Sequence, residues 1–351
     1  DCIGSIEELK EKADNCPDEI ELHRPYIDAV TIKCPKCGKE MHRVPEVIDC
    51  WFDSGSMPFA QHHYPFENKD KFERNYPADF IVEYIGQVRA WFYYVHVVNT
   101  TLAEIGAFGK ERQQSDHKNA YKNVITTGVV AGNDGRKMSK SLGNYTDPNV
   151  LMDQYSADSL RFLLLSSPLL NGEDFALLDK DVSDVARKLA MVWNMYDFFT
   201  TYASVDGWGY NGGAVPEIDL AALQNPLDRW IVSRVHELSA HIEEFMNGYN
   251  IPDALSAVMP FLDDASNWYV RRSRRRFWKS EDDTDKNQAY QTIHYVLVRL
   301  SMVLAPFVPF LADELYQKLT GGESVHLLDW PHNNPVDDKV LADMARTRNL
   351  I

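Results

Sequence analysis

The sequence predicts an α/β unit followed by an all-α helical bundle. In the first part, the apolar stretch Phe80–Leu102 is typical of a helix, and Lys122–Ala131, rich in Val, Ile and Thr, is typical of a buried strand. A helix followed by a strand is the pattern of parallel α/β sheets. From Asp181 onward, apolar residues recur every three or four positions, as on the buried face of a helix.

The regions between these elements also have recognisable patterns. Residues 1–50 are polar and interrupted by four prolines, so we expect a small inserted segment. Asp147 before Pro148 predicts a helix start, because a side-chain acceptor and a ring without an N–H both suit the first turn. Residues 206–226, rich in glycine and proline, predict a loop between the first two helices of the bundle.

Composition limits the classes of protein to consider. The 351 residues are 44% hydrophobic and 25% charged, which excludes a disordered chain. No apolar run approaches the roughly 20 residues of a membrane-spanning helix, so we expect a soluble, cytoplasmic protein without a membrane partner. Five cysteines, an odd number, argue against a disulfide framework.

Positive charge is concentrated in one segment of an acidic chain. The 36 basic and 52 acidic residues give a formal charge of -16, yet Trp268–Lys279 contains six basic residues and no acid. Guanidinium groups beside aromatic rings suit RNA phosphates and unstacked bases. Candidate RNA ligands are the four residues that share one side of a helix, Arg271, Arg274, Arg275 and Trp278. In the alternative interpretation, the arginines are solvated or pair with the acids that follow, Glu281, Asp282, Asp283 and Asp285.

The loop after the predicted strand has the clearest chemical signal. Lys137 and Lys140, three positions apart, can close over a polyphosphate and stabilise the charge that develops on a leaving pyrophosphate. Met138 lies between them, and the hydroxyls of Ser139 and Ser141 add hydrogen-bond donors. A solvated loop without function is the alternative that these residues alone leave open.

Five segments together resemble the isoleucyl-tRNA synthetases, a family of class I aminoacyl-tRNA synthetases. RKMSKSLGN (136–144) is similar to the signature loop of that class, and DCWFDSGS (49–56) resembles the family's DxWFDSGS. EYIGQVRAW (83–91) and ADSLR (157–161) resemble its EGxDQxRGW and ADALR segments, and NWYVRRSRRRFW (267–278) resembles part of its anticodon-binding domain. The resemblance implies the second half of a Rossmann-like nucleotide-binding fold, followed by the helical anticodon-binding domain.

The resemblance also implies an activity. A member of the family activates isoleucine with ATP and Mg²⁺ and transfers it to tRNA(Ile), and we expect a monomer. Residues 137–141 would bind ATP, with Lys140, and secondarily Lys137, as the catalytic residues. The aminoacyl-adenylate would contact a second group of residues, namely Glu83, Gln87, Trp51, Trp91 and Asp53. The two tryptophans would form walls of the isoleucine pocket, and ordinary core packing is their alternative role.

The chain departs from the family pattern in two ways. Tyr84, Gly86 and Ala90 stand where the family has Gly, Asp and Gly, so a ribose contact of that Asp does not transfer to Gly86. In addition, the sequence contains no HIGH-type segment, which class I synthetases need for adenylation. We therefore expect a piece of a longer synthetase that is inactive alone.

A C-x2-C knuckle, Cys34 and Cys37, is the candidate metal site. Its turn presents two thiolates to one ion, and structural zinc takes four ligands, so the site is incomplete. Cys2 and His42 are candidates for further ligands. Zn²⁺ is therefore a candidate cofactor.

Four regions follow from the resemblance. They are a remnant of an inserted domain with the knuckle (1–50), the second half of the catalytic domain (51–145), a stem-contact connection (146–180) and the anticodon-binding domain (181–351). Two other functions stay open: a non-catalytic tRNA- or RNA-binding module, and a ligase for valine, leucine or methionine. The WFDSGS segment followed by Met57, Pro58 and Phe59 favours isoleucine.

Overall fold

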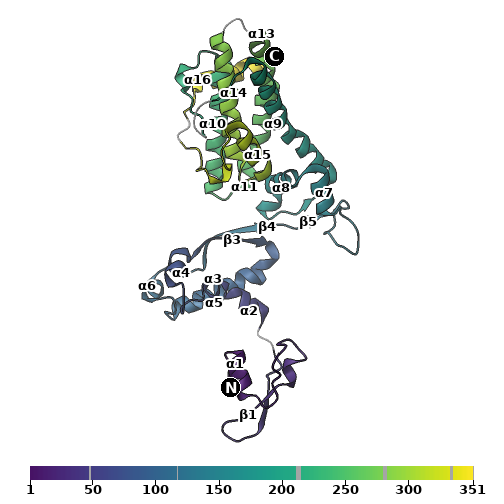
Figure 1. The fold of residues 1–351 in the computed structure, drawn as a ribbon, viewed down its shortest axis with the longest axis vertical. Coiled ribbons are helices and arrows are strands. Elements are labelled where there is room, and N and C mark those ends of the chain that lie inside the picture. Colours follow the sequence, from purple (N-terminus) through teal and green to yellow (C-terminus); the bar gives the residue numbers. More distant parts are fainter. Residues whose placement is uncertain (47–48, 117, 211–214, 280–282, 333–334, 351) are drawn as a thin grey trace. The chain divides into compact units, whose positions relative to one another are not determined.

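The computed structural model describes residues 1–46, 49–116, 118–210, 215–279, 283–332 and 335–350 (Figure 1). The chain divides into two compact units, residues 1–79 with 87–122, and residues 80–86 with 123–351. The predicted fold class is confirmed, because α/β elements that include a parallel strand pair precede a helical part.

The first unit is built from short helices and strands around an aromatic cluster. Phe72 is fully buried, and its ring lies 4.3 Å from that of Tyr64, 5.0 Å from that of Tyr76 and 5.1 Å from that of Phe108. Burial raises the pKa of Tyr76 to about 12. The elements are α1 (Ile6–Lys12), η1 (Ile27–Ala29), the antiparallel pair β1 (Thr31–Lys33) and β2 (Glu40–His42), α2 (Cys50–Gly55), α3 (Met57–Ala60), α4 (Lys69–Asn75), α5 (Trp91–Glu104) and α6 (Lys110–Gln114).

The predicted helix Phe80–Leu102 is wrong in its first half. Residues Ala78–Tyr84 form strand β3, a 3₁₀ turn η2 (Ile85–Arg89) follows, and only α5 is helical. Short apolar runs do not distinguish a strand from a helix, and here pairing with β4 (Tyr121–Thr127) decides the outcome. The predicted strand Lys122–Ala131 is confirmed as β4 and β5 (Val130–Ala131), with a break between them.

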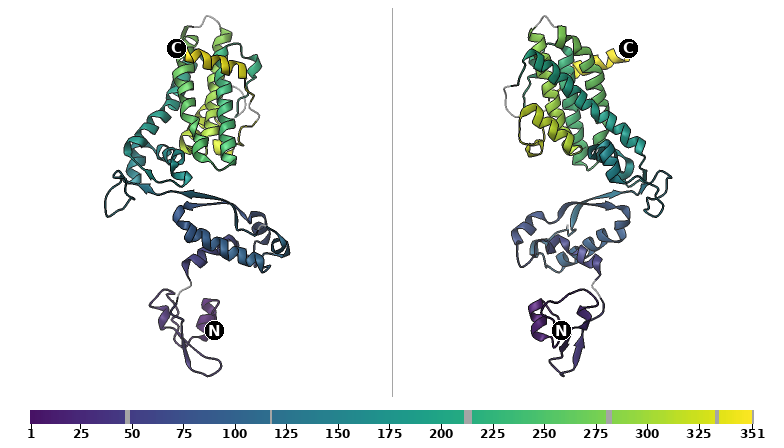
Figure 2. Two further views of the ribbon diagram at one scale, coloured as in Figure 1. Left: turned by 180° about the vertical axis from the view of Figure 1, so that it is seen from behind. Right: turned by 45° about the vertical axis from the view of Figure 1, so that its right-hand side comes forward.

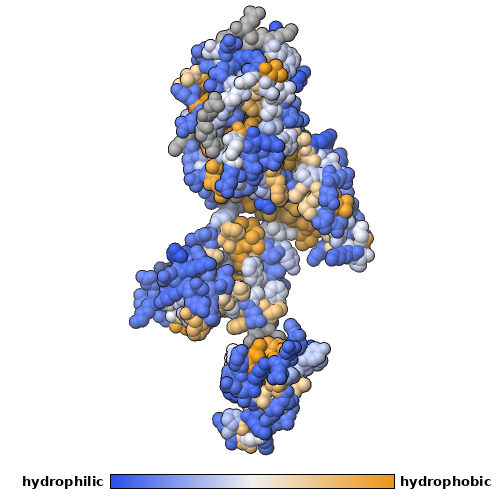
Figure 3. Space-filling view, in the orientation of Figure 1, coloured by the Kyte–Doolittle hydropathy of each residue, from blue (hydrophilic) through white to orange (hydrophobic). Residues whose placement is uncertain are grey.

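The sheet formed by β3 and β4 has an uncovered apolar surface. Phe80, Val82 and Val124 are 48%, 42% and 51% exposed. Figure 3 shows apolar residues, in orange, at the surface where β3 lies. Strands of α/β sheets are usually covered on both faces, so this exposure is unusual.

The second unit contains the predicted helical bundle (Figures 1 and 2). Strand β5 pairs in parallel with β6 (Phe175–Ala176), and Asp147 caps α7, as predicted. The helices are α7 (Pro148–Tyr155), α8 (Ala157–Ser166), η3 (Pro168–Asn171), α9 (Asp179–Asp206), η4 (Leu220–Ala222), α10 (Pro226–Asn247), α11 (Ile251–Ser256), α12 (Val258–Asp263), the π-helix η5 (Asp264–Val270), α13 (Arg271–Lys279), α14 (Asp283–Leu304), α15 (Pro309–Thr320), η6 (Val325–Leu327) and α16 (Asp338–Asn349).

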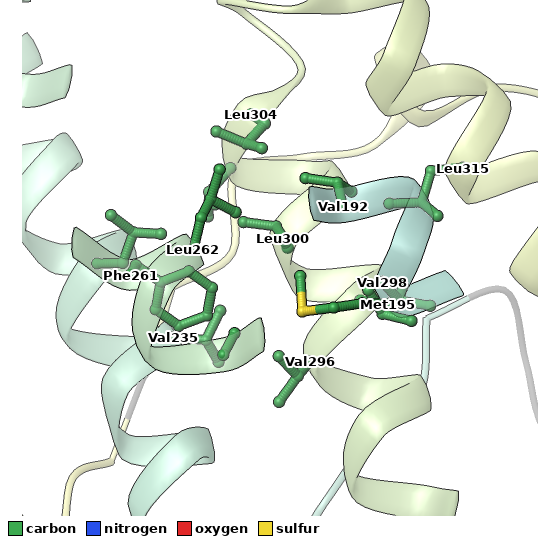
Figure 4. Packing of buried hydrophobic residues seen from close by; sticks show 14 of the residues in the cluster. Val192, Met195, Val235, Phe261, Leu262, Val296, Val298, Leu300, Leu304 and Leu315 are labelled. Carbon is green, nitrogen blue, oxygen red and sulfur yellow. The ribbon is translucent and has the colours of Figure 1, made fainter. Parts of the chain in front are cut away.

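One continuous core holds this bundle together. Figure 4 shows side chains from α9, α10, α12, α14 and α15 pointing toward one another. Val192, Val235, Phe261, Leu300 and Leu315 are each at most 1% exposed. Burying a side chain of this size contributes about 1.5–3 kcal/mol. Phe277 of α13 belongs to the same core, which therefore holds the basic helix on the bundle. Among the described residues, no helix is long and apolar enough to cross a membrane.

Candidate functional site

The lysine loop, residues 132–144, is organised by one side chain, Asn144. The Asn144 Oδ1 accepts from the Ser139 backbone N–H at 3.0 Å, and its Nδ2 donates to Asp134 Oδ1 at 2.9 Å. The same Nδ2 lies 3.3 Å from the carbonyl oxygens of Arg136 and Lys137. A Cβ at Gly132 would lie 2.0 Å from the Asn144 carbonyl oxygen, so only glycine allows this close approach. Asn144 therefore fixes the two ends of the loop against each other.

Lys137 and Lys140 are both exposed, and their ammonium groups have no hydrogen-bond or ion-pair partner among the described residues. Lys137 forms an isolated bridge with Ala131, and Met138 packs against the small core beneath the loop. The Ser139 and Ser141 hydroxyls lie 2.8 Å apart. Hydrogen bonds from Asn144 and Arg136 lower the pKa of Asp134 to about 2. That carboxylate therefore stays charged at neutral pH and pairs with Arg136 rather than with either lysine.

In the first unit, helix α2 packs closely against α5. A Cβ at Gly55 would lie 2.9 Å from the Tyr94 backbone, and the buried Asn99 donates to the Gly55 carbonyl at 2.8 Å. The Trp91 indole N–H donates to the Ser54 carbonyl at 3.3 Å, so Trp91 ties the start of α5 to α2. The SG pair of the WFDSGS segment therefore has a packing role.

The other predicted adenylate ligands differ in their surroundings. Gln87 is half-buried, and its Oε1 accepts from the Trp91 backbone N–H at 3.0 Å. Trp51 is 37% exposed, and Asp53 is exposed on the same helix. Glu83 belongs to the second unit, where its exposed carboxylate accepts from the Tyr84 backbone N–H at 3.0 Å. Gln87, Trp91, Trp51 and Asp53 all lie in the first unit, and Glu83 lies in the second.

Two of the departures from the family pattern are structurally linked. A Cβ at Gly86 would lie 2.4 Å from the ring of Tyr84. The tyrosine thus occupies the space that a larger residue at position 86 would need. An aspartate at 86 therefore requires the Tyr84 ring to move.

Helix α13 separates its arginines into two groups. Arg271, Arg274 and Arg275 are exposed, and Trp278 is 49% exposed with its ring 6.3 Å from that of Tyr202 on α9. Arg272 is held over the ring of Trp268 at 4.5 Å. The side chains of Lys279, Glu281 and Asp282 lie outside those that the structure describes, and the predicted pairing with the last two lies there as well.

Arg276 instead belongs to the interior. It donates to both carboxylate oxygens of Asp228 at 2.8 and 2.7 Å and to Asp285 at 2.8 and 2.7 Å. Asp228 is fully buried and also accepts from the Tyr269 hydroxyl at 2.8 Å. Of the predicted acid pairs, the one with Asp285 is therefore present and links α13 to α14, and the pair with Asp228 links α13 to α10.

The ADSLR segment joins the lysine-loop region to the bundle. Asp158, 5% exposed, accepts from the backbone N–H groups of Leu311 at 2.7 Å and Phe310 at 3.4 Å, at the start of α15. Arg161 donates to the Pro306 carbonyl at 3.0 Å. This pair anchors α8 on the turn between α14 and α15.

The cysteine knuckle is formed, but the described residues supply only two ligands. The Cys34 N–H donates to the Lys39 carbonyl, and the Gly38 N–H donates to the Cys34 carbonyl, both at 2.8 Å. Hydrogen bonds from the backbone N–H groups of Lys36 and Cys37 lower the pKa of the Cys34 thiol, which favours a thiolate. Among the described residues, no group of three His, Cys, Asp or Glu side chains could hold a metal, so Cys2 and His42 do not complete the site.

Comparison with known proteins places this arrangement in a family. The family model "tRNA synthetases class I (I, L, M and V)" matches residues 2–176, and "Anticodon-binding domain of tRNA ligase" matches residues 228–351. The chain therefore belongs to the class I tRNA synthetases and contains sequence of both their catalytic and their anticodon-binding domains.

Isoleucine–tRNA ligases are among the similar curated proteins of this family. That of Treponema denticola is 44% identical over 346 residues, which cover 95% of this chain and 30% of the relative. That of Clostridium tetani is 45% identical over 340 residues, covering 94% of this chain and 31% of the relative. The chain thus spans about a third of the length of these relatives.

A solved structure supports the fold. The LeuRS of Agrobacterium radiobacter, in a ternary complex with tRNA and LeuAMS, has a TM-score of 0.66 and 21% identity. The match covers 89% of this chain and 36% of that one. At this identity, the likeness extends to the fold alone.

Proposed function

We propose that this chain provides part of an isoleucine–tRNA ligase, which activates isoleucine with ATP and Mg²⁺ and transfers it to tRNA(Ile). The observation that carries the proposal is the 44% identity to an isoleucine–tRNA ligase over 95% of the chain. The geometry of the lysine loop agrees with it, because a frame built by Asn144 holds at the surface two ammonium groups that no described residue pairs with.

In this proposal, Lys140 and Lys137 stabilise the negative charge that moves onto pyrophosphate when the isoleucine carboxylate attacks the α-phosphate of ATP. The loop residues Met138, Ser139 and Ser141 complete the ATP-binding segment. Trp51 and Trp91 provide flat apolar walls for the isoleucine side chain, and Glu83, Gln87 and Asp53 bind the adenylate. The exposure of Trp51 and the fixed position of Trp91 support these roles.

We further propose that tRNA contacts the exposed face of α13 through Arg271, Arg274, Arg275 and Trp278. The three arginines are exposed and have no partner among the described residues, whereas Arg276 is bonded to Asp228 and Asp285. In this scheme residues 1–50 belong to an inserted domain, 51–145 to the catalytic domain, 146–180 to a stem-contact connection and 181–351 to the anticodon-binding domain. Cys34 and Cys37 supply two of the four ligands of a zinc ion, and the ligase acts as a monomer.

A chimaeric enzyme tests the catalytic proposal. The chain replaces the matching segment of the T. denticola ligase, and isoleucine-dependent exchange of pyrophosphate into ATP is measured. We expect exchange that Lys140→Ala reduces by about 100-fold or more, because one such group contributes about 3–4 kcal/mol in the transition state. Lys180→Ala, another lysine of the second unit, is the control.

A second candidate, a non-catalytic RNA-binding module, rests on the departure at Gly86 and Tyr84. It predicts that the chimaera binds tRNA but shows no exchange. Restoring the family residues with Gly86→Asp and Tyr84→Gly together would then restore exchange. If the unmodified chimaera already exchanges pyrophosphate with isoleucine, this candidate is rejected.

A further inference from the structure

The carboxyl end of the sheet formed by β3 and β4 leads to the lysine loop. The first residues of the two strands meet, because the Ala78 N–H donates to the Ala120 carbonyl at 2.9 Å and Lys122 pairs with Asp79 at 2.8 Å. The strands therefore run in the same direction. Strand β4 continues through β5 into the lysine loop (Figure 1). Because ligands of open α/β sheets bind beyond the carboxyl ends of the strands, a nucleotide held by this loop should reach the end of β3.

Tyr84, the last residue of β3, offers a phenol at this end. It is 40% exposed, and its hydroxyl has no hydrogen-bond partner among the described residues. Residue 86 is a glycine, and a Cβ there would lie 2.4 Å from the Tyr84 hydroxyl oxygen. The phenol therefore lies where it does because position 86 has no side chain. Both residues belong to the second unit, as does the lysine loop.

The chemistry of these two features suits different parts of a nucleotide. Lys137 and Lys140 carry exposed ammonium groups, which bind phosphates. A phenol is neutral and both donates and accepts a hydrogen bond, so it suits a partner that does the same, and a sugar hydroxyl is such a partner. Gly86 has no side chain that could bind the sugar in its place. Tyr84 is therefore the candidate for the ribose contact at the end of β3.

We propose that the Tyr84 hydroxyl binds a ribose hydroxyl of ATP and that Gly86 provides the space for the phenol. The inference rests on the proposed ligase function and adds a residue that contacts the substrate. It also gives the linked departures at positions 84 and 86 a role in the reaction. Tyr84 then makes the enzyme prefer a ribonucleotide to its deoxy analogue.

The test uses the chimaeric ligase and measures kcat/KM for ATP, 2′-deoxy-ATP and 3′-deoxy-ATP in isoleucine-dependent pyrophosphate exchange. Tyr84→Phe removes the hydroxyl and keeps the ring. Gly86→Ala keeps the hydroxyl and displaces the ring, because the added methyl group would overlap it. Tyr26→Phe, which removes the hydroxyl of another exposed tyrosine, is the matched control.

We expect the unmodified chimaera to use one of the two deoxy analogues about three- to tenfold less well than ATP, which is the effect of losing one hydrogen bond. Tyr84→Phe and Gly86→Ala should each lower kcat/KM for ATP by a similar factor. Neither variant should lower kcat/KM further for that deoxy analogue, because the hydrogen bond is already absent. Tyr26→Phe should behave like the unmodified chimaera.

Two results would overturn the ribose contact and leave the proposed function standing. One is an equal kcat/KM for ATP in Tyr84→Phe and in the unmodified chimaera. The other is a loss in Tyr84→Phe that has the same size for ATP and for both deoxy analogues, since the hydroxyl would then act elsewhere. An unmodified chimaera without any exchange would contradict the proposed function and this inference together.

Discussion

Replacing Arg276 with alanine should destabilise the second unit strongly, although Arg276 lies in a segment otherwise suited to RNA. The change removes both hydrogen bonds to Asp228 and those to Asp285. Asp228 is 0% exposed and, among the residues that the structure describes, would keep only the Tyr269 hydroxyl as a hydrogen-bond partner. Removing one member of a buried ion pair costs about 3–5 kcal/mol, because the other charge stays buried without compensation. Asp285, whose side chain is 32% exposed, can regain water and adds little.

Urea unfolding followed by circular dichroism at 222 nm, which reports mainly on the bundle, measures the effect. With a denaturant slope of about 2–3 kcal/mol per M, the midpoint should fall by roughly 1–2 M. Arg276→Lys should give an intermediate loss, because lysine keeps the charge but cannot bridge two carboxylates with a planar fork. Arg275→Ala, one position away and exposed, should change stability by less than about 0.5 kcal/mol.

The same variants separate folding from recognition. Arg275→Ala should weaken tRNA binding and flatten its salt dependence, while leaving the urea midpoint unchanged. A midpoint for Arg276→Ala within about 0.3 M of the unmodified chain, at an equal slope, would refute the buried role of this arginine.

Three further outcomes are expected. Asp158→Ala should lower the free energy of unfolding in urea by about 1–2 kcal/mol, because it removes the acceptor of two N–H groups at the start of α15. Replacing the exposed Asp153 with alanine should leave it unchanged, and equal midpoints for the two variants would contradict the capping role of Asp158. Burial lowers the pKa of His236 below its usual 6.5, so on acidification this imidazole binds a proton in the unfolded chain before it does so in the folded chain. The free energy of unfolding therefore has its full value above pH 6.5 and decreases below it. His236→Gln should flatten this decrease between pH 7.5 and 5.5. An undiminished fall in that variant would assign the pH dependence to another group. Asn144→Ala should speed hydrogen exchange in residues 133–144 measured by mass spectrometry, whereas Asn149→Ala should not, and equal protection in both would remove Asn144 as the organiser of the loop.

The apolar pattern of the long helices is sufficient to predict the bundle. The spacing of apolar residues predicted α9, α10 and α14, because every turn of a long amphipathic helix repeats the same signal. Strand β3 was missed because its seven residues are too short for a period to emerge, and pairing with a strand about 40 positions later overrides local preference.

The contrast between Arg275 and Arg276 shows that the local sequence does not determine which arginine of a basic segment is buried. Both lie in the same basic run, and the positions of Asp228, 48 residues upstream, and of Asp285 hold Arg276 inside. Asn144 lies in RKMSKSLGN and Asp158 in ADSLR, two of the segments that resemble the family. Nothing in either segment indicated that the Asn144 amide would bond Ser139 and Asp134 of its own loop, or that the Asp158 carboxylate would bond backbone N–H groups of α15.

The bare sheet of β3 and β4 has a practical consequence for anyone who purifies this chain. Within the described residues both outer edges of the pair lack a neighbouring strand, and its apolar side chains face solvent. Unpaired backbone edges next to apolar side chains recruit extended segments of other molecules, which promotes aggregation. Yield and light scattering should therefore depend steeply on concentration, and a charged residue at Val124, which is 51% exposed, should relieve that dependence.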